Sequence, residues 1–193
     1  MEKHLLLEEL QAKYAFPDED FPKLIELFGH CTYRKNAMLF SAGELVKHTW
    51  FILKGCVRQY YIGPEGRERI IYFAREGNWC GELNSFLHEE PTKLSMQALE
   101  DVEAIYLTRT NWEKAITTIP AFAMYHITNH QRLMVKLKEE LGMAVNESPD
   151  EKYRRLVQEN PELLQRLPQY QIAMYLGITP ETLSRIRKRN AKI

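Results

Sequence analysis

The sequence predicts an α+β protein in which a β-rich roll precedes one long helix and a C-terminal helix-turn-helix. Three observations support this prediction. Short β-prone runs bounded by glycines recur between about 35 and 108, and an apolar seam at helical spacing continues from about 120 to 144. The segment 169–188, QYQIAMYLGITPETLSRIRK, has the pattern of two short helices around one tight turn.

The composition is that of an ordinary soluble domain or pair of domains. The chain has 193 residues, of which 45% are hydrophobic and 27% charged. Its formal net charge is zero, so any affinity for nucleic acid must come from a local patch. Three widely spaced cysteines argue against a disulfide scaffold, and neither a signal-peptide pattern nor a membrane-spanning run occurs. We therefore expect a cytoplasmic protein without membrane contact.

The first 118 residues are predicted to form a β-roll with short N-terminal helices. Residues 1 to about 30 have helical spacing that Pro17 and Pro22 divide into two short helices. Runs such as TWFILKG, CVRQYYIG, RIIYFA and EAIYL then follow at the spacing of strands in an all-β roll or barrel. The segment 63–66, Gly-Pro-Glu-Gly, is predicted to be a hairpin turn.

Residues 119–145 are predicted to form a linker helix, after a short helix that Thr110 and Asn111 cap. Its apolar seam has alternating four- and three-residue steps, which favours pairing with a second copy of the helix. The seam residues are Ile127, His130, Met134, Leu137 and Leu141. The alternative is that the seam packs on the chain's own β-roll.

Residues 146–193 are predicted to form a helix-turn-helix domain behind a hinge at 146–149. Two short helices, 150–159 and 161–167, precede the tail. In the tail, Ala173 stands where two helices must approach closely, and Gly177 stands where the turn needs a positive φ. Thr179 can cap the second helix, with Pro180 at its first position.

The second tail helix carries the side chains expected to contact DNA. A glutamate can accept a hydrogen bond from a cytosine amino group, and an arginine can bind guanine through two hydrogen bonds. Five basic side chains stand against one acidic side chain between 179 and 193, which suits phosphate binding. The expected DNA-contacting residues are Gln169, Gln171, Thr179, Pro180, Glu181, Thr182, Ser184, Arg185, Lys188 and Arg189.

In this order, the roll, seam helix and tail resemble the Crp/Fnr family of bacterial transcription regulators. The glycine framework is similar to the family's cyclic-nucleotide-binding roll at Gly43, Gly55, Gly66, Gly77 and Gly81. The resemblance implies a double-stranded β-helix (jelly roll), a dimerisation helix and a winged-helix DNA-binding domain. It also implies homodimers on palindromic operators, with RNA polymerase as a further partner. Since no β-rich run follows the second tail helix, any wing must precede it.

The residues at the family's base-reading positions match better than those at its nucleotide-binding positions. Glu181 and Arg185 match base-reading positions, whereas Pro180 replaces a frequent arginine. In the nucleotide cassette Gly81, Glu82 and Leu83 match, but Thr92 and Lys93 replace the arginine and serine that hold the cyclic phosphate. On the seam helix, Leu137 and Lys138 replace small hydroxyl residues. We expect an unknown small-molecule effector other than cyclic AMP; the alternative is a cyclic nucleotide bound by Glu82 and Lys93.

An enzymatic alternative is a metal-dependent cupin, because cupins share the roll. Cupins need histidines and a carboxylate that converge on one metal, and the six histidines here show no close pair within the roll. No G-x-S-x-G, P-loop or dinucleotide fingerprint occurs either. We therefore expect no catalytic residues, metal or cofactor. The function that we expect is that of a sequence-specific DNA-binding regulator.

Overall fold

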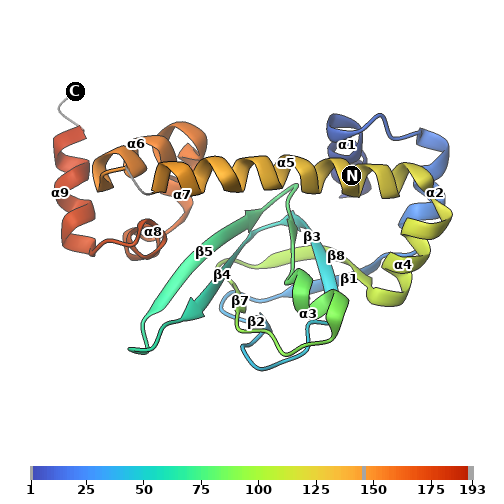
Figure 1. Ribbon diagram of the computed structural model, residues 1–193, viewed down its shortest axis with the longest axis horizontal. Coiled ribbons are helices and arrows are strands. Elements are labelled where there is room, and N and C mark those ends of the chain that lie inside the picture. Colours follow the sequence, from blue (N-terminus) through green and yellow to red (C-terminus); the bar gives the residue numbers. More distant parts are fainter. Residues whose placement is uncertain (1, 145–146, 191–193) are drawn as a thin grey trace. The chain divides into compact units, whose positions relative to one another are not determined.

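The predicted roll is present as two four-stranded sheets (Figure 1). In this computed structural model, which describes residues 2–144 and 147–190, one sheet has the order β1-β8-β3-β6 and the other has the order β2-β7-β4-β5. The strands are β1 (Gly29–Tyr33), β2 (Met38–Phe40), β3 (His48–Lys54), β4 (Cys56–Ile62), β5 (Glu68–Arg75), β6 (Trp79–Cys80), β7 (Ser95–Ala98) and β8 (Val102–Thr108).

Strand β3 is buried on both faces because its alternating side chains enter two different apolar clusters. It pairs antiparallel with β8 and β6, so Trp50 lies opposite both Tyr106 and Cys80. Trp50 and Ile52 belong to one apolar cluster of the roll, whereas Phe51 belongs to a second cluster that also contains residues of the N-terminal and linker helices. The centre of the TWFILKG run, residues 50–53, is therefore continuously apolar rather than alternating.

Short N-terminal helices complete the second cluster. They are α1 (Glu2–Lys13), the 3-10 turn η1 (Asp18–Asp20) and α2 (Phe21–Ile25). Leu6, Leu10 and Leu24 are fully buried there. The prediction that Pro22 interrupts the helices is wrong, since Pro22 lies in the first turn of α2, where the missing N–H costs no helix hydrogen bond.

Local hydrogen bonds define one turn of the roll and the start of the helix that follows its last strand. The predicted 63–66 turn is confirmed, with the Gly63 amide donating to the Arg67 carbonyl at 2.9 Å and Gly66 at φ +72°. Helix α3 (Leu83–His88) follows β6. Helix α4 (Arg109–Thr118) begins earlier than the predicted cap, because the Thr108 hydroxyl accepts from the Asn111 amide at 3.2 Å.

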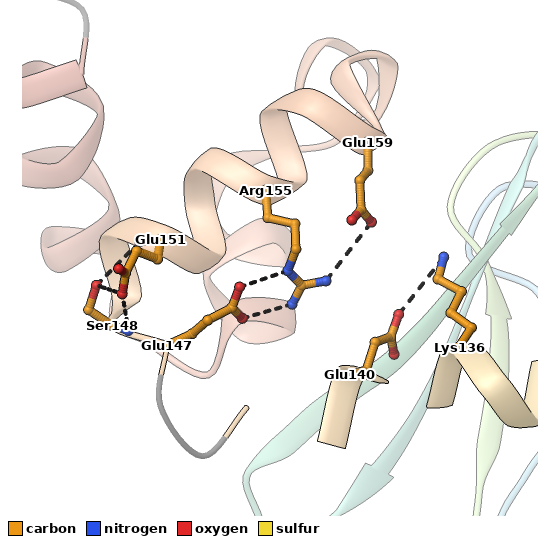
Figure 2. Close-up of polar contacts among 7 residues, drawn as sticks. All are labelled: Lys136, Glu140, Glu147, Ser148, Glu151, Arg155 and Glu159. Atoms are coloured by element: carbon orange, nitrogen blue, oxygen red, sulfur yellow. Dashed lines mark hydrogen bonds and ion pairs between the residues drawn. The ribbon is translucent and has the colours of Figure 1, made fainter. Parts of the chain in front are cut away.

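The long helix is confirmed as α5 (Pro120–Ala144), and the C-terminal region follows it as α6 (Pro149–Glu159), α7 (Pro161–Arg166), α8 (Gln169–Leu176) and α9 (Pro180–Asn190). Ser148 and Glu151 form a capping box at the start of α6. Figure 2 shows Arg155 donating two hydrogen bonds to Glu147, both at 3.0 Å. Asn146, in the predicted hinge, lies outside the described residues.

The described residues from 147 to 190 are helical or lie in short connections, without a strand. The winged part of the predicted winged helix is therefore not found in this described segment, because its sequence consists of short helices separated by prolines and a glycine. Contacts divide the chain into two compact units, Met1–Gln59 with Phe73–Val135 and Tyr60–Tyr72 with Lys136–Ile193. Among the helices described, none has the length and apolarity that a membrane crossing requires.

Candidate nucleic-acid interface and effector region

The turn between α8 and α9 has the geometry that the sequence predicts. Gly177 has φ +69° and caps α8, and the Ile178 amide donates to the Ala173 carbonyl at 3.0 Å. Ala173 is fully buried, and Leu183 and Ile186 of α9 are 1% and 2% exposed. A side chain at residue 177 would be strained at this φ, so the glycine permits the tight turn from which α9 leaves.

Helix α9 begins at a threonine cap and presents charged side chains to solvent. The Thr179 hydroxyl accepts from the Thr182 amide at 3.2 Å. Glu181, Arg185 and Lys188 are exposed, whereas Thr182 and Ser184 are half-buried. The Glu181 pKa is lowered, first by its own backbone N–H, then by the Thr179 hydroxyl and the nearby Arg185 charge. The exposed face of α9 therefore combines one carboxylate with guanidinium and ammonium groups.

Two predicted contact residues are placed differently from the others. Gln171 is only 3% exposed, so its inclusion among the DNA contacts is corrected: its side chain lies in the interior of the helical region. Arg189 is exposed but forms an ion pair with Asp150 at the start of α6. The predicted basic residue Lys192 lies outside the described residues.

The start of α8 contains a surface residue that the motif comparison missed. Tyr170 is 52% exposed beside the exposed Gln169, and its hydroxyl accepts from Gln171 Nε2 at 3.0 Å. The available signal was an aromatic residue at an outward position of a short helix. Tyr170 therefore adds an exposed aromatic hydroxyl in the first turn of α8.

The predicted seam is exposed along α5. Ile127, Met134, Leu137 and Leu141 are 49%, 56%, 45% and 69% exposed, and His130 is exposed as well. Leu133, which the heptad pattern omitted, lies on the same side of the helix and is 49% exposed. Earlier in α5, Phe122 and Tyr125 are fully buried in the roll's second cluster. The first part of α5 therefore packs in the roll's second cluster, whereas its later part carries the exposed apolar face.

The carboxylate of Glu82, in the predicted effector cassette, accepts hydrogen bonds from the chain's own backbone. Its carboxylate caps α3, accepting from the Asn84 amide at 3.0 Å and from the Ser85 amide at 2.9 Å. Each carboxylate oxygen therefore accepts one backbone N–H. Gly81 before it has φ +152°, and Leu83 after it is 48% exposed.

The two residues that replace the phosphate-binding pair differ in their exposure to solvent. Thr92 is 4% exposed, and its hydroxyl accepts from the Leu94 amide at 3.0 Å. Lys93 is exposed. Adjacent residues thus divide between the interior and the surface, and the interior one is a neutral hydroxyl already bonded to its own turn.

Strand β4 supplies buried polar groups that the motif comparison did not single out. Gln59 Nε2 donates to the Gly81 carbonyl at 3.2 Å, and it shares a strand face with Val57 of the roll core. Arg58 is 7% exposed on the opposite face, where Nε and Nη2 donate to Gln97 Oε1 at 3.0 and 2.8 Å. The alternation of β4 therefore directs Arg58 away from the side that carries Val57 and Gln59.

The residues that could bind a metal or respond to oxidants do not form a site. Within residues 2–144 and 147–190, no three histidine, cysteine, aspartate or glutamate side chains gather as metal ligands. Cys80 is buried, and burial raises the pKa of its thiol, which makes the reactive thiolate scarce.

His126 is the histidine with the most unusual surroundings. Its ring contacts those of Trp79, Trp112, Phe122 and Tyr125, with the Phe122 ring centroid at 4.5 Å. Both ring nitrogens are buried without a hydrogen-bond partner. Burial, followed by the charge of His130, lowers the pKa of His126 to about 3.

Comparisons with known proteins agree with this architecture. The cyclic nucleotide-binding domain family matches residues 30–118. The probable transcriptional regulator Flp of Lacticaseibacillus casei is 23% identical over 164 residues, 82% of this chain and 74% of Flp. The cAMP-activated global transcriptional regulator CRP of Salmonella typhimurium is 26% identical over 168 residues, 86% of this chain but only 60% of that relative.

Solved structures show the same fold. A CooA mutant from Carboxydothermus hydrogenoformans superposes with a TM-score of 0.74 at 22% identity, covering 97% of this chain and 84% of that one. The Thermus thermophilus catabolite activator protein has a TM-score of 0.62 at 22% identity, covering 95% and 87%. The named sequence relatives are transcriptional regulators rather than enzymes. The chain is therefore similar over most of its length to transcriptional regulators of the Crp/Fnr type, and its residues 30–118 match the cyclic nucleotide-binding domain family.

Proposed function

We propose that the chain is a homodimeric, sequence-specific DNA-binding regulator in which α9 reads bases in the major groove. The observation that carries the proposal is that Glu181 and Arg185 are exposed on the helix that follows the tight turn at Gly177. Carboxylate and guanidinium groups are the partners of cytosine and guanine edges, respectively. The basic end of α9 supports phosphate binding around the reading residues.

A titration against duplex DNA tests the proposal. The probe is the DNA upstream of the chain's own gene, compared with a shuffled duplex of equal length and composition over a salt series. We expect tighter binding to the upstream duplex and an affinity that falls steeply with salt on both duplexes, because phosphate contacts release counterions. The absence of binding to either duplex at low salt would contradict the proposal.

The exposed seam of α5 supports the homodimer. An apolar face of several leucine, isoleucine and methionine side chains is costly to leave in water, and a second copy can cover it in register. Leu137→Lys introduces a charge on this face, and we expect it to shift the sedimentation profile toward monomer. Val135 is 57% exposed on another side of α5, so Val135→Lys is the matched control that should stay dimeric.

The effector of this regulator is, in our proposal, a small molecule other than cyclic AMP. Support comes from Glu82, whose carboxylate already caps α3, and from Thr92, whose hydroxyl already bonds the Leu94 amide. Calorimetric titration with cyclic AMP should therefore give no binding heat. Micromolar binding that Glu82→Ala or Lys93→Ala removes would instead establish the cyclic-nucleotide alternative.

The remaining partners follow from the dimer. Two copies of α9 related by a two-fold axis fit a palindromic operator, and footprinting should then protect two half-sites separated by one helical turn or a multiple of it. At such operators RNA polymerase is the further protein partner that we propose, and the bacterial cytoplasm is where both DNA and polymerase are available. Protection of a single half-site would argue for a monomeric reader.

A further inference from the structure

Arg185 does not extend freely from α9. Its Nη2 group donates a hydrogen bond to the Thr182 hydroxyl oxygen at 3.2 Å, across one turn of the helix. The Arg185 side chain is exposed, so without this bond it would sample many rotamers in solvent. The bond thus selects a subset of guanidinium positions on the face that we assign to base reading.

Thr182 is itself fixed at its position. Its amide donates to the Thr179 hydroxyl oxygen at 3.2 Å, and the two threonine hydroxyl oxygens lie within hydrogen-bond distance of each other, at 3.2 Å. The Thr182 oxygen therefore lies beside the helix cap on one side and accepts from Arg185 on the other. Its β-branched side chain has a restricted χ1 and is half-buried, which limits how far this acceptor can move.

The bond to Thr182 leaves the base-reading chemistry of Arg185 available. A guanidinium has five N–H donors in one plane, and Thr182 uses one of them. The remaining donors can still form the two parallel hydrogen bonds to guanine O6 and N7. Glu181 contributes a nearby charge, yet among the hydrogen bonds of the described residues the partner of Arg185 is Thr182.

We propose that Thr182 is a positioning residue for base recognition: its hydroxyl oxygen holds the Arg185 guanidinium in the orientation that contacts a guanine edge. The inference rests on the proposed DNA-binding function. It gives Thr182 a role that the exposed face of α9 alone would not suggest, since a threonine there would otherwise be assigned to a phosphate. Side chains that read bases with high discrimination need such support from neighbours.

Thr182→Val and Thr182→Ser separate the hydroxyl from the shape of the side chain. Valine keeps the branched shape and lacks the acceptor, whereas serine keeps the acceptor. The probe is a library of duplexes with randomised sequence, and the readout is relative affinity for each base at each position. We expect Thr182→Val to weaken the preference at the single position that Arg185→Ala abolishes, by about 3- to 10-fold, the size of one hydrogen bond.

Thr182→Ser should keep the wild-type preference within about twofold, since the acceptor is retained. An equal loss of affinity for all sequences with Thr182→Val would make Thr182 a phosphate contact and overturn the inference. Wild-type discrimination by Thr182→Val would overturn it as well. If the wild-type protein itself shows no base preference, the proposed function fails. Melting curves for all variants confirm that α9 remains folded.

Discussion

Helices α3 and α9 both begin at a polar side chain that caps the first turn, and the two caps leave the neighbouring side chains in different situations. Thr179 caps α9 with a short hydroxyl, so Glu181 and Arg185 remain exposed beyond it. At α3, Glu82 folds its whole carboxylate onto the Asn84 and Ser85 amides. A residue at a family's binding position thus keeps that role only if its own chain leaves its polar atoms free.

The largest loss of stability is expected in the C-terminal region. Leu183 is 1% exposed between α9 and its neighbouring helices, so Leu183→Ala should cost about 2–5 kcal/mol through lost burial and a cavity. Hydrogen exchange should show lost protection in α8 and α9 while strands β1, β3 and β8, which belong to the other compact unit, keep theirs. Val135→Ala, at a side chain 57% exposed on another side of α5 than the seam, is the control and should leave the exchange pattern unchanged. Equal loss of protection in the strands would mean that the two units do not fold independently.

Between pH 8 and pH 5 the roll should instead show a pH dependence that comes from a buried histidine, a residue type that does not occur between 147 and 190. The pKa of His126 is lowered to about 3 in the folded state, against roughly 6.5 when unfolded. Its neutral form is native, so its contribution is complete above about pH 6.5 and decreases as the pH falls toward 3. Between pH 8 and pH 5 the folded state should lose roughly 2 kcal/mol from this group alone.

His126→Phe is the variant that isolates this group. Phenylalanine keeps an aromatic ring against Trp79 and Trp112 and removes both unpartnered nitrogens. The difference in unfolding free energy between wild type and His126→Phe should therefore grow as the pH is lowered. His30→Phe, at an exposed ring on β1, is the matched control. A difference that stays constant between pH 8 and pH 5 would show that His126 is accessible to protons when folded.

At the start of α3 a smaller effect is expected. Glu82→Ala removes the acceptor for two backbone amides and should destabilise the roll by about 1 kcal/mol, as other helix caps do. Glu82→Gln keeps one carboxamide oxygen and should lose less. Chemical denaturation followed through the tryptophans of the roll measures both. If neither variant changes stability, Glu82 is available to a ligand and the contrast with Thr179 disappears.

The smallest effect is expected beside the connection into α6. Arg155 donates two hydrogen bonds to Glu147, whereas it forms only an ion pair with Glu159, at 3.9 Å (Figure 2). Both groups of the main pair are partly solvated, so Glu147→Gln should cost less than about 1 kcal/mol and should lose its effect at high salt. Glu159→Gln should cost less still. A larger loss for Glu159→Gln would reverse the assignment of the main partner.

The sequence predicts the tail better than the roll's ligand chemistry because the tail depends on local rules. The positive φ of Gly177, the small Ala173 and the cap at Thr179 each follow from one turn of chain. The fate of Glu82 depends instead on where α3 starts, and the burial of Gln171 depends on helices that approach it from elsewhere. Such contacts arise from tertiary packing, which spacing along the chain does not encode.

The aromatic surroundings of His126 illustrate the same limit. Its partners come from β6, α4 and α5, so no motif in the sequence brings them together. The wing is the reverse case, in which the resemblance implies an element that the described residues 147–190 do not contain. Family patterns therefore predict which elements occur in order, and the structure decides which side chains remain available.

The central claim, that α9 reads bases through Arg185, is tested most directly by measuring affinities for a selected duplex and its single-base variants with wild type and Arg185→Ala. We expect Arg185→Ala to remove about 1–3 kcal/mol of discrimination at one base position and to leave the preferences at other positions in place. A loss of affinity that is equal on every sequence would contradict it, because Arg185 would then bind only the DNA backbone.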